Sequence, residues 1–285
     1  MQSLRKVGLL YHPKLPDSIN LAAQIELTLR QAGVSVWSGS SWDEAAIIEQ
    51  VPDLDMFITL GGDGSILRAA RIAAPHNIPI LGVNLGRLGF LAEMEPAEIA
   101  EKLPLLREGQ YWLEERLMLH AEHQRQGQTL GCYEALNDIV VCRGSAVRVI
   151  RPAVFVNGVH LITYVADGVI TATPTGSTAY TLSSGGPIVA PNVQDIILTP
   201  IAPHLTPARA FVFSGKEVIT LDVATEYDAI LSVDGQIDVK LLDRDIVRVE
   251  ASEYTAKFAR LQPPAYFYRT LLERLRGPNS RGDPM

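Results

Sequence analysis

The chain has few cysteines, no long apolar run and no excess of basic residues, and each shortage excludes a class of protein. Its two cysteines, Cys132 and Cys142, could form one disulfide, but no export signal opens the chain and we expect buried free thiols. No apolar run approaches the roughly 18–20 residues of a membrane-spanning helix. The net charge of −7 argues against non-specific nucleic-acid binding, which needs a cationic face. We therefore expect a soluble, cytoplasmic protein with neither a membrane nor a nucleic acid as its partner.

Two catalytic motifs are also missing. No G-x-G-x-x-G opens a strand–helix–strand unit, so the sequence does not indicate a nicotinamide-dependent dehydrogenase. None of the six histidines has a metal-ligand spacing such as H-E-x-x-H, so a zinc hydrolase is not indicated either.

The first third of the chain alternates between strand and helix patterns. Apolar runs predict strands at Lys6–Tyr11, Val34–Trp37, Met56–Leu60 and Ile78–Asn84. Between and after them, helical patterns cover Asn20–Ala32 (with Gly33 as its stop), Trp42–Gln50, Ile66–Ala74 and Pro96–Leu106. This alternation predicts a parallel, doubly wound sheet, in which ligands bind beyond the carboxyl ends of the strands.

From Trp112 onward the pattern changes to strands and turns. Strand-like segments cover Glu115–Glu122, Leu130–Cys142 and Val147–Asn157, and the dipeptide Asn157-Gly158 predicts a hairpin. We expect an α/β domain over residues 1–105 and a β-rich domain over 106–254. We also expect a C-terminal helix over about 255–276, clearest from Tyr266, that packs back on the first domain, and a disordered tail at 277–285.

A glycine turn, Gly61-Gly62-Asp63-Gly64-Ser65, follows the third predicted strand and precedes a helix, with Ser65 as the expected N-cap. Backbone N–H groups at such a turn favour a bound phosphate, and glycine lets a ligand approach closely. Asp63 could take a proton from a substrate hydroxyl or help to hold Mg²⁺. A plain tight turn with Asp as a turn former is the alternative.

Three polar clusters lie in the β-rich half. Asn137-Asp138 precedes a strand, and Asp234-Gly235 is a favoured hairpin dipeptide, so both could be simple turns. The segment Thr173–Tyr180 is harder to explain as a loop, because five of its eight residues carry hydroxyl groups. Such a segment can present hydroxyls and a Tyr ring to a purine and a ribose.

Together these segments resemble one family, the ATP/polyphosphate-dependent NAD kinases. The resemblance runs in order through nearly the whole chain: GGDGS at 61–65, N-x-G-x-LGFL at 84–91, ERLML at 115–119, Asn137-Asp138, Asp167-Gly168, TPTGSTAY at 173–180, PIAPH at 200–204 and Asp234-Gly235. The GGDG element is shared with diacylglycerol and sphingosine kinases and with phosphofructokinases. TPTGSTAY is far more specific.

The resemblance implies a Rossmann-like N-terminal domain and a β-rich, β-sandwich-like C-terminal domain, with NAD bound between them. It implies transfer of phosphate to the 2′-hydroxyl of the adenosine ribose of NAD, giving NADP, with Asp63 as the catalytic residue. The positions that match the family's substrate and nucleotide site are Gly62, Gly64, Phe90, Leu91, Asn137, Asp138, Asp167, Thr175, Thr178, Ala179, Tyr180 and Ser183. We add Arg68, Arg148, His204, Asp234 and Gln236 as further candidates.

The chain departs from the family at two positions. Many relatives have Glu where this chain has Asp138, which shortens the reach of the carboxylate, and several have Thr where it has Ser65. The resemblance implies no fixed protein ligands for a metal, and Mg²⁺ arriving with ATP or polyphosphate.

The resemblance also implies a homodimer or homotetramer. We expect apolar surface along 147–156 and 169–172 to contact a second copy. The choice between ATP and polyphosphate stays open. A lipid kinase would share GGDG but need no hydroxyl-rich segment, and a non-catalytic NAD sensor could do without Asp63.

Overall fold

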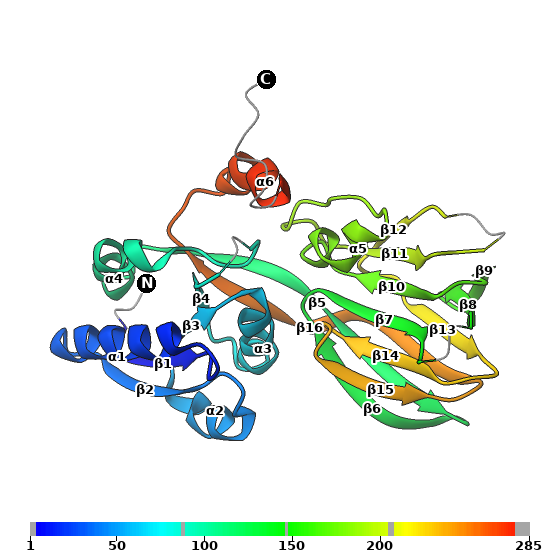
Figure 1. Ribbon diagram of the computed structural model, residues 1–285, viewed down its shortest axis with the longest axis horizontal. Coiled ribbons are helices and arrows are strands. Elements are labelled where there is room, and N and C mark those ends of the chain that lie inside the picture. The colour runs from blue at the N-terminus through cyan, green and yellow to red at the C-terminus, as the bar shows by residue number, and fades with distance from the viewer. Residues whose placement is uncertain (1–3, 87–88, 146–147, 205–207, 277–285) are drawn as a thin grey trace. The chain divides into compact units, whose positions relative to one another are not determined.

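The computed structural model describes residues 4–86, 89–145, 148–204 and 208–276, and the chain divides into two compact units (Figure 1). The first unit runs to Glu115 and resumes at Ala256, and the second covers Arg116–Thr255. The first is an α/β unit and the second is built of antiparallel strands, so the predicted fold class is confirmed. The expected tail at 277–285 lies outside the described residues.

The first unit is organised around a parallel sheet with the strand order β2-β1-β3-β4. These strands are β1 (Lys6–Tyr11), β2 (Ser35–Ser40), β3 (Met56–Gly61) and β4 (Ile80–Asn84). Every residue of β3 and β4 is buried, as expected for central parallel strands covered on both faces. Their ends pair at Gly61 and Asn84, so both glycine-rich loops begin at one edge of the sheet.

Helices connect these strands. They are α1 (Pro16–Gln31), α2 (Glu44–Gln50), α3 (Asp63–Ala73) and α4 (Ile99–Arg107), with 3₁₀ turns at Val51–Asp53, Ala74–His76 and Pro96–Glu98. The predicted start of the first helix at Asn20 was too late, because Pro16 occupies its first turn, where a missing N–H costs nothing. Its buried face is Ser18, Ala22, Ile25 and Leu29. Gly33 follows the helix with φ +83°, which confirms the predicted stop.

The domain boundary predicted at 105 falls inside α4. Leu103 and Leu106 of this helix are buried in the core of the first unit, so the chain stays in that unit until β5 (Trp112–Arg125) has begun. The helix predicted over about 255–276 was also too long. The strand β16 (Asp245–Arg260) continues to Arg260, where Phe258 pairs with Ile80 of β4, and α6 covers Tyr266–Arg276.

The second unit is a sandwich of two antiparallel layers (Figure 1). One layer has the order β12-β11-β10-β7-β14-β15, and the other has the order β6-β5-β16-β13-β8-β9. Apolar side chains from both layers, such as Val141, Val169, Leu221 and Val247, form one buried cluster, which is how a sandwich fills its interior. The strands are β6 (Gln128–Ala135), β7 (Asp138–Arg143), β8 (Arg151–Val156), β9 (Val159–Thr163), β10 (Gly168–Ala172), β11 (Asp195–Ile201), β12 (Phe211–Ser214), β13 (Ile219–Ala224), β14 (Ala229–Val233) and β15 (Ile237–Leu241).

Several local predictions can be compared with this unit. The hairpin at Asn157-Gly158 is confirmed, with positive φ at both residues. The single strand expected at 130–142 is two strands, because Leu136-Asn137 separates β6 from β7. Both cysteines are free, but Cys132 is exposed and not buried as predicted, since β6 turns it outward. In the described part of the chain no helix has the length and apolar character needed to cross a bilayer.

Candidate active site

The glycine turn places Asp63 at the start of α3. β3 ends at Gly61, Gly62 is the N-cap, and Asp63 is the first residue of the helix. Ser65 is therefore inside the helix and is not its N-cap as predicted; it is buried against Gly61, where a methyl group on the glycine would collide with it. A carboxylate in the first turn interacts favourably with the positive end of the helix dipole.

The Asp63 carboxylate is held by the second glycine-rich loop. Its Oδ2 accepts the Phe90 N–H at 2.9 Å, and its Oδ1 accepts the Leu91 N–H at 3.3 Å. A methyl group on Gly89 would overlap this carboxylate, so the close approach requires glycine. The structure thus brings together Asp63, Phe90 and Leu91, which the sequence proposed separately. Arg87 and Leu88 of the same loop lie outside the described residues.

Two arginines from the C-terminal part of the first unit bind the carbonyl groups of this loop. Arg260 donates from Nη1 to the Leu91 carbonyl at 2.9 Å, and Arg274 donates from Nη1 to the Phe90 carbonyl at 3.3 Å. Arg260 is buried and also pairs with Glu114 (2.7 Å) and Glu93 (3.3 Å). Sequence reasoning missed both arginines, because no local pattern indicates which loop they reach.

The hydroxyl-rich segment of the second unit forms a compact turn, with a 3₁₀ turn at Gly176–Thr178 and a helix, α5, at Tyr180–Ser183. Four of its five hydroxyl-bearing residues bond within the protein, so the segment presents fewer hydroxyls to a ligand than its composition indicates. Thr173 donates to the Leu136 carbonyl, Ser177 to the Pro174 carbonyl and Thr178 to the Thr175 carbonyl.

Four residues around this turn have different surroundings. The Thr175 hydroxyl accepts a hydrogen bond from Arg116 at 3.1 Å. Ala179 is half-buried, whereas Tyr180 and Ser183 are exposed. The surface of this turn that a ligand can reach is therefore formed mainly by the residues after Ser177.

Asp234 holds the segment that contains Asn137 and Asp138. Its carboxylate accepts the N–H groups of Leu136 (3.1 Å), Asn137 (2.7 Å) and Asp138 (3.2 Å). Asp234 and Gly235 both have positive φ in the turn between β14 and β15. Asp234 is thus a support for its neighbours, a role that the dipeptide alone did not reveal.

Asp138 is buried beside this second carboxylate. Burial, and then the charge of Asp234, raise the pKa of Asp138 to about 7. The raised pKa favours the protonated carboxyl group, which can donate a hydrogen bond as well as accept one. The pKa of the Tyr180 phenol is also raised, first by burial and then by charges that include Asp167 and Asp138.

Several of the other candidate residues contact groups other than Asp63 and the hydroxyl-rich turn. Asp167 forms an ion pair with Arg143 at 3.0 Å, and Arg68 lies 3.6 Å from Glu44. His204 is exposed, and its N–H donates to the Val165 carbonyl. Arg148 lines a cavity of about 320 Å³, and the Gln236 N–H closes the turn on Val233. Gly62 and Gly64 flank Asp63 in the first unit.

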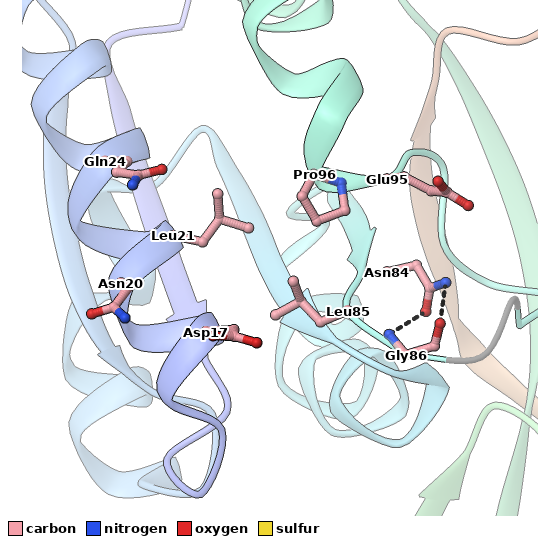
Figure 2. A pocket seen from close by; sticks show the side chains of 9 residues that line it. All are labelled: Asp17, Asn20, Leu21, Gln24, Asn84, Leu85, Gly86, Glu95 and Pro96. Atoms are coloured by element: carbon pink, nitrogen blue, oxygen red, sulfur yellow. Dashed lines mark hydrogen bonds between the residues drawn. The ribbon is translucent and has the colours of Figure 1, made fainter.

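A cavity of about 560 Å³ in the first unit lies next to the second glycine-rich loop (Figure 2). Asn84 and Gly86, which hydrogen-bond to one another, border it together with Leu85. The remaining lining residues are Asp17, Asn20, Leu21, Gln24, Glu95 and Pro96. Two carboxylates and no basic side chain occur among these nine described residues, so the cavity does not suit a phosphate group.

Comparison with known proteins identifies the family. A family model described as the ATP-NAD kinase N-terminal domain matches residues 17–111, and one described as the ATP-NAD kinase C-terminal domain matches residues 136–261. The chain is 39% identical over 276 residues to an NAD kinase of Dehalococcoides mccartyi strain CBDB1, covering 96% of this chain and 97% of that protein. It is 41% identical over 273 residues to an NAD kinase of Chloroflexus aggregans, covering 96% and 99%.

Two solved structures are similar. Yeast NADH kinase complexed with NADH matches with a TM-score of 0.86 at 25% identity, covering 100% of this chain and 91% of that one. An NAD kinase from Archaeoglobus fulgidus in complex with ATP matches with a TM-score of 0.75 at 29% identity, covering 95% and 98%. The order of motifs, the fold of each unit and these similarities agree, and the chain belongs to the ATP-NAD kinase family of enzymes, which phosphorylate NAD.

Proposed function

We propose that the enzyme transfers the terminal phosphoryl group of ATP to the 2′-hydroxyl of the adenosine ribose of NAD, forming NADP. The observation that carries this proposal is the Asp63 carboxylate at the N-terminus of α3, oriented by two amides of the neighbouring loop. The relatives named NAD kinase and the similar structures with NADH and with ATP support the two substrates.

The proposed chemical role of Asp63 is to orient the ribose hydroxyl and take its proton. An ionised carboxylate has about four lone-pair positions, and the two amide hydrogen bonds occupy two of them. Within the described part of the chain, the other positions are assigned in this proposal to a hydroxyl proton or a cation. Phosphoryl transfer needs an aligned nucleophile and neutralised charge, with little covalent chemistry from the protein. Gly62 and Gly64, at the start of α3, supply backbone donors close to where a phosphate would bind.

Mg²⁺ is the cofactor in this proposal, and it neutralises phosphate charge when bound with the donor. Mg²⁺ is usually held by one or two carboxylates together with substrate phosphates and water. Asp63 fits this pattern, because it is a carboxylate at the anion-favouring N-terminal end of a helix. Inorganic polyphosphate is an alternative donor with the same chemistry.

The second unit supplies the nucleotide-binding residues in this proposal. Tyr180, Ser183, Thr178 and Ala179 offer a ring, hydroxyls and backbone groups on the accessible side of the turn. Asn137 and Asp138 offer polar groups held in place by Asp234. Phe90 and Leu91 are proposed to lie near the ribose, and the remaining candidates are Asp167, Thr175, Arg68, Arg148, His204 and Gln236.

A homodimer or homotetramer in the cytoplasm completes the proposal. The apolar surface expected at 169–172 does not exist, because all of β10 is buried. Val159 and Leu161, on the edge strand β9, are 71% and 38% exposed, and this edge is a surface that a second copy could cover. Two free cysteines accord with a reducing compartment.

The direct test is an assay of the purified chain with NAD and Mg²⁺, first with ATP and then with polyphosphate. NADP is detected with an NADP-specific dehydrogenase, and the phosphate position is established by phosphorus NMR. We expect NADP with at least one donor. A phosphorylated lipid, or bound NAD without turnover, would contradict the proposal.

A further inference from the structure

One peptide group in the first unit is hydrogen-bonded at both ends by charged side chains. It joins Phe90 to Leu91. Its N–H donates to Asp63 Oδ1 at 3.3 Å, and its carbonyl accepts from Arg274 Nη1 at 3.3 Å. Because a peptide group is planar and rigid, the N–H direction follows the carbonyl direction. Arg274 and Asp63 are therefore connected through a single rigid unit.

The surroundings of Arg274 hold it at this carbonyl. Its guanidinium lies over the rings of Phe90 and Tyr266, at 5.7 and 5.6 Å from their centroids. Burial lowers the pKa of Arg274, whereas Tyr266 and Asp63 act to raise it, so the guanidinium and the Asp63 carboxylate interact electrostatically. The neighbouring Leu91 carbonyl is bound by Arg260 in the same way.

We propose that Arg274 is a positioning residue for Asp63, which makes α6 a part of the catalytic apparatus. A cation on the carbonyl polarises the peptide group and strengthens donation by the N–H at its other end. Loss of that cation leaves the Phe90 carbonyl without this partner and lets the peptide rotate, so that the carboxylate loses one of its two amide donors. This inference rests on the proposed role of Asp63.

The expected kinetic effect is on turnover. Arg274→Met removes the charge and the donors but keeps a long apolar side chain between the rings. We expect kcat to fall roughly 10-fold to 100-fold, the usual range for one hydrogen bond to a charged group, with the KM for NAD changed by less than about 3-fold. Arg274→Lys keeps the positive charge and one donor nitrogen in place of three, so it should recover part of the lost kcat.

The matched control is Arg269→Met on the same helix. Arg269 is exposed and lies over the Tyr266 ring at 5.6 Å, so its removal changes the charge of α6 by the same amount. We expect its kcat to stay close to that of the wild type. Thermal unfolding of each variant shows whether a kinetic loss comes from loss of structure.

The decisive measurement is a double-mutant cycle with Asp63→Asn. If Arg274 acts through Asp63, Arg274→Met should reduce kcat much less in the Asp63→Asn background than in the wild type. An equal reduction in both backgrounds, or a rise in KM for NAD at unchanged kcat, overturns the inference. If Arg274→Met does not fold, the same cycle is run with Arg274→Lys and decides in the same way.

Failure of this inference is distinguishable from failure of the proposed function. A wild-type chain that makes no NADP refutes the proposed function. A wild-type chain that makes NADP, together with an Arg274→Met variant of equal kcat, refutes only the role of Arg274.

Discussion

Asp63 carries a negative charge in a turn that otherwise favours anions, because its neighbours are glycines and it begins a helix. Phosphate binding alone would be better served by an uncharged residue at that position. The charge is compensated in part by the Phe90 and Leu91 amides. We therefore expect the carboxylate in this turn to act in the reaction, either by accepting a proton or by binding a cation.

Asp63→Asn tests this task. General-base assistance contributes about 10²- to 10⁴-fold to a rate, so we expect kcat to fall by that factor while NAD affinity, measured by calorimetry, changes by a few fold. The Asn amide nitrogen would face one of the two amide donors, so thermal unfolding should accompany the kinetics. Near-normal kcat with lost NAD binding would instead make Asp63 a ligand anchor.

Tyr180→Ala tests the proposed nucleotide-binding residues of the second unit. Tyr180 is 45% exposed at the start of α5, in a segment whose preceding hydroxyls bond within the protein. Loss of one stacking or hydrogen-bonding contact costs on the order of 1–3 kcal/mol, so the KM for NAD should rise about 5- to 100-fold with little change in kcat. Tyr227→Ala, at a similarly exposed tyrosine (48%), is the control. Unchanged NAD affinity with lost ATP affinity would assign the segment to the other substrate.

At the level of elements, the important contact is between the start of α3 and the loop after β4. The two meet because β3 and β4 are adjacent parallel strands that end together at Gly61 and Asn84. The loop then approaches so closely at Gly89 that the Asp63 carboxylate occupies the space of a side chain. The geometry of the proposed catalytic group is thus determined by two neighbouring strand–loop connections.

Gly89→Ala should displace the Asp63 carboxylate without unfolding the protein. A displacement of about 1 Å can cost about 10²-fold in rate, and we expect a fall in kcat of that order by steady-state kinetics. Gly86→Ala is the matched control, because a methyl group at Gly86 would enter open space in the same loop. Equal kcat for the two variants would show that the approach of the carboxylate to Gly89 has no catalytic consequence.

For the whole molecule, we expect a buried cluster around Asp245 in the second unit to contribute to stability in acid. Asp245 accepts hydrogen bonds from His123 at 2.8 Å and from two nitrogens of Arg125 at 2.7 Å. Burial acts to raise the pKa of Asp245, but the hydrogen bonds from Arg125, the Leu242 amide and His123 outweigh it and lower the pKa to about 2. A carboxyl group with a lowered folded-state pKa stabilises the fold above its unfolded pKa and loses this contribution as the pH falls.

The wild type should therefore lose about 2 kcal/mol of unfolding free energy from this group between about pH 4 and pH 2. Asp245→Asn should be less stable at neutral pH and show a smaller loss over that interval, measured by urea denaturation at each pH. Asp228→Asn removes an exposed pair with Lys240 and should change stability by less than about 1 kcal/mol. Identical acid dependence of the wild type and Asp245→Asn would refute the role of this cluster.

Assembly is the other property of the whole molecule. With Val159 and Leu161 exposed on the edge strand β9, we expect light scattering to give the mass of two or four chains. Val159→Lys should reduce that mass if β9 is at the contact. A fully active monomer at assay concentration would contradict the proposed assembly.

The features that depend on neighbouring residues could be predicted from the sequence. Alternating strand and helix patterns predicted the α/β unit, and the turn at Asn157-Gly158 and the helix stop at Gly33 followed from local backbone preferences. The position of Asp63 between a buried strand and a helix was also a local property. The predicted first residues of three helices were wrong: α1 begins at Pro16, α3 begins before Ser65, and α6 begins at Tyr266. At these positions more than one residue can serve as the helix start.

Contacts between groups far apart in the chain could not be predicted from the sequence and became visible in the folded structure. The three amides bound by Asp234, the carbonyls bound by Arg260 and Arg274, and the space taken from Gly89 by Asp63 all join segments far apart in the chain. A hydrogen bond depends on the distance and direction between two atoms, and these are set by strand order and packing rather than by residue type. Composition could therefore indicate a hydroxyl-rich segment at 173–180, but the fold decided that most of those hydroxyls bond inward.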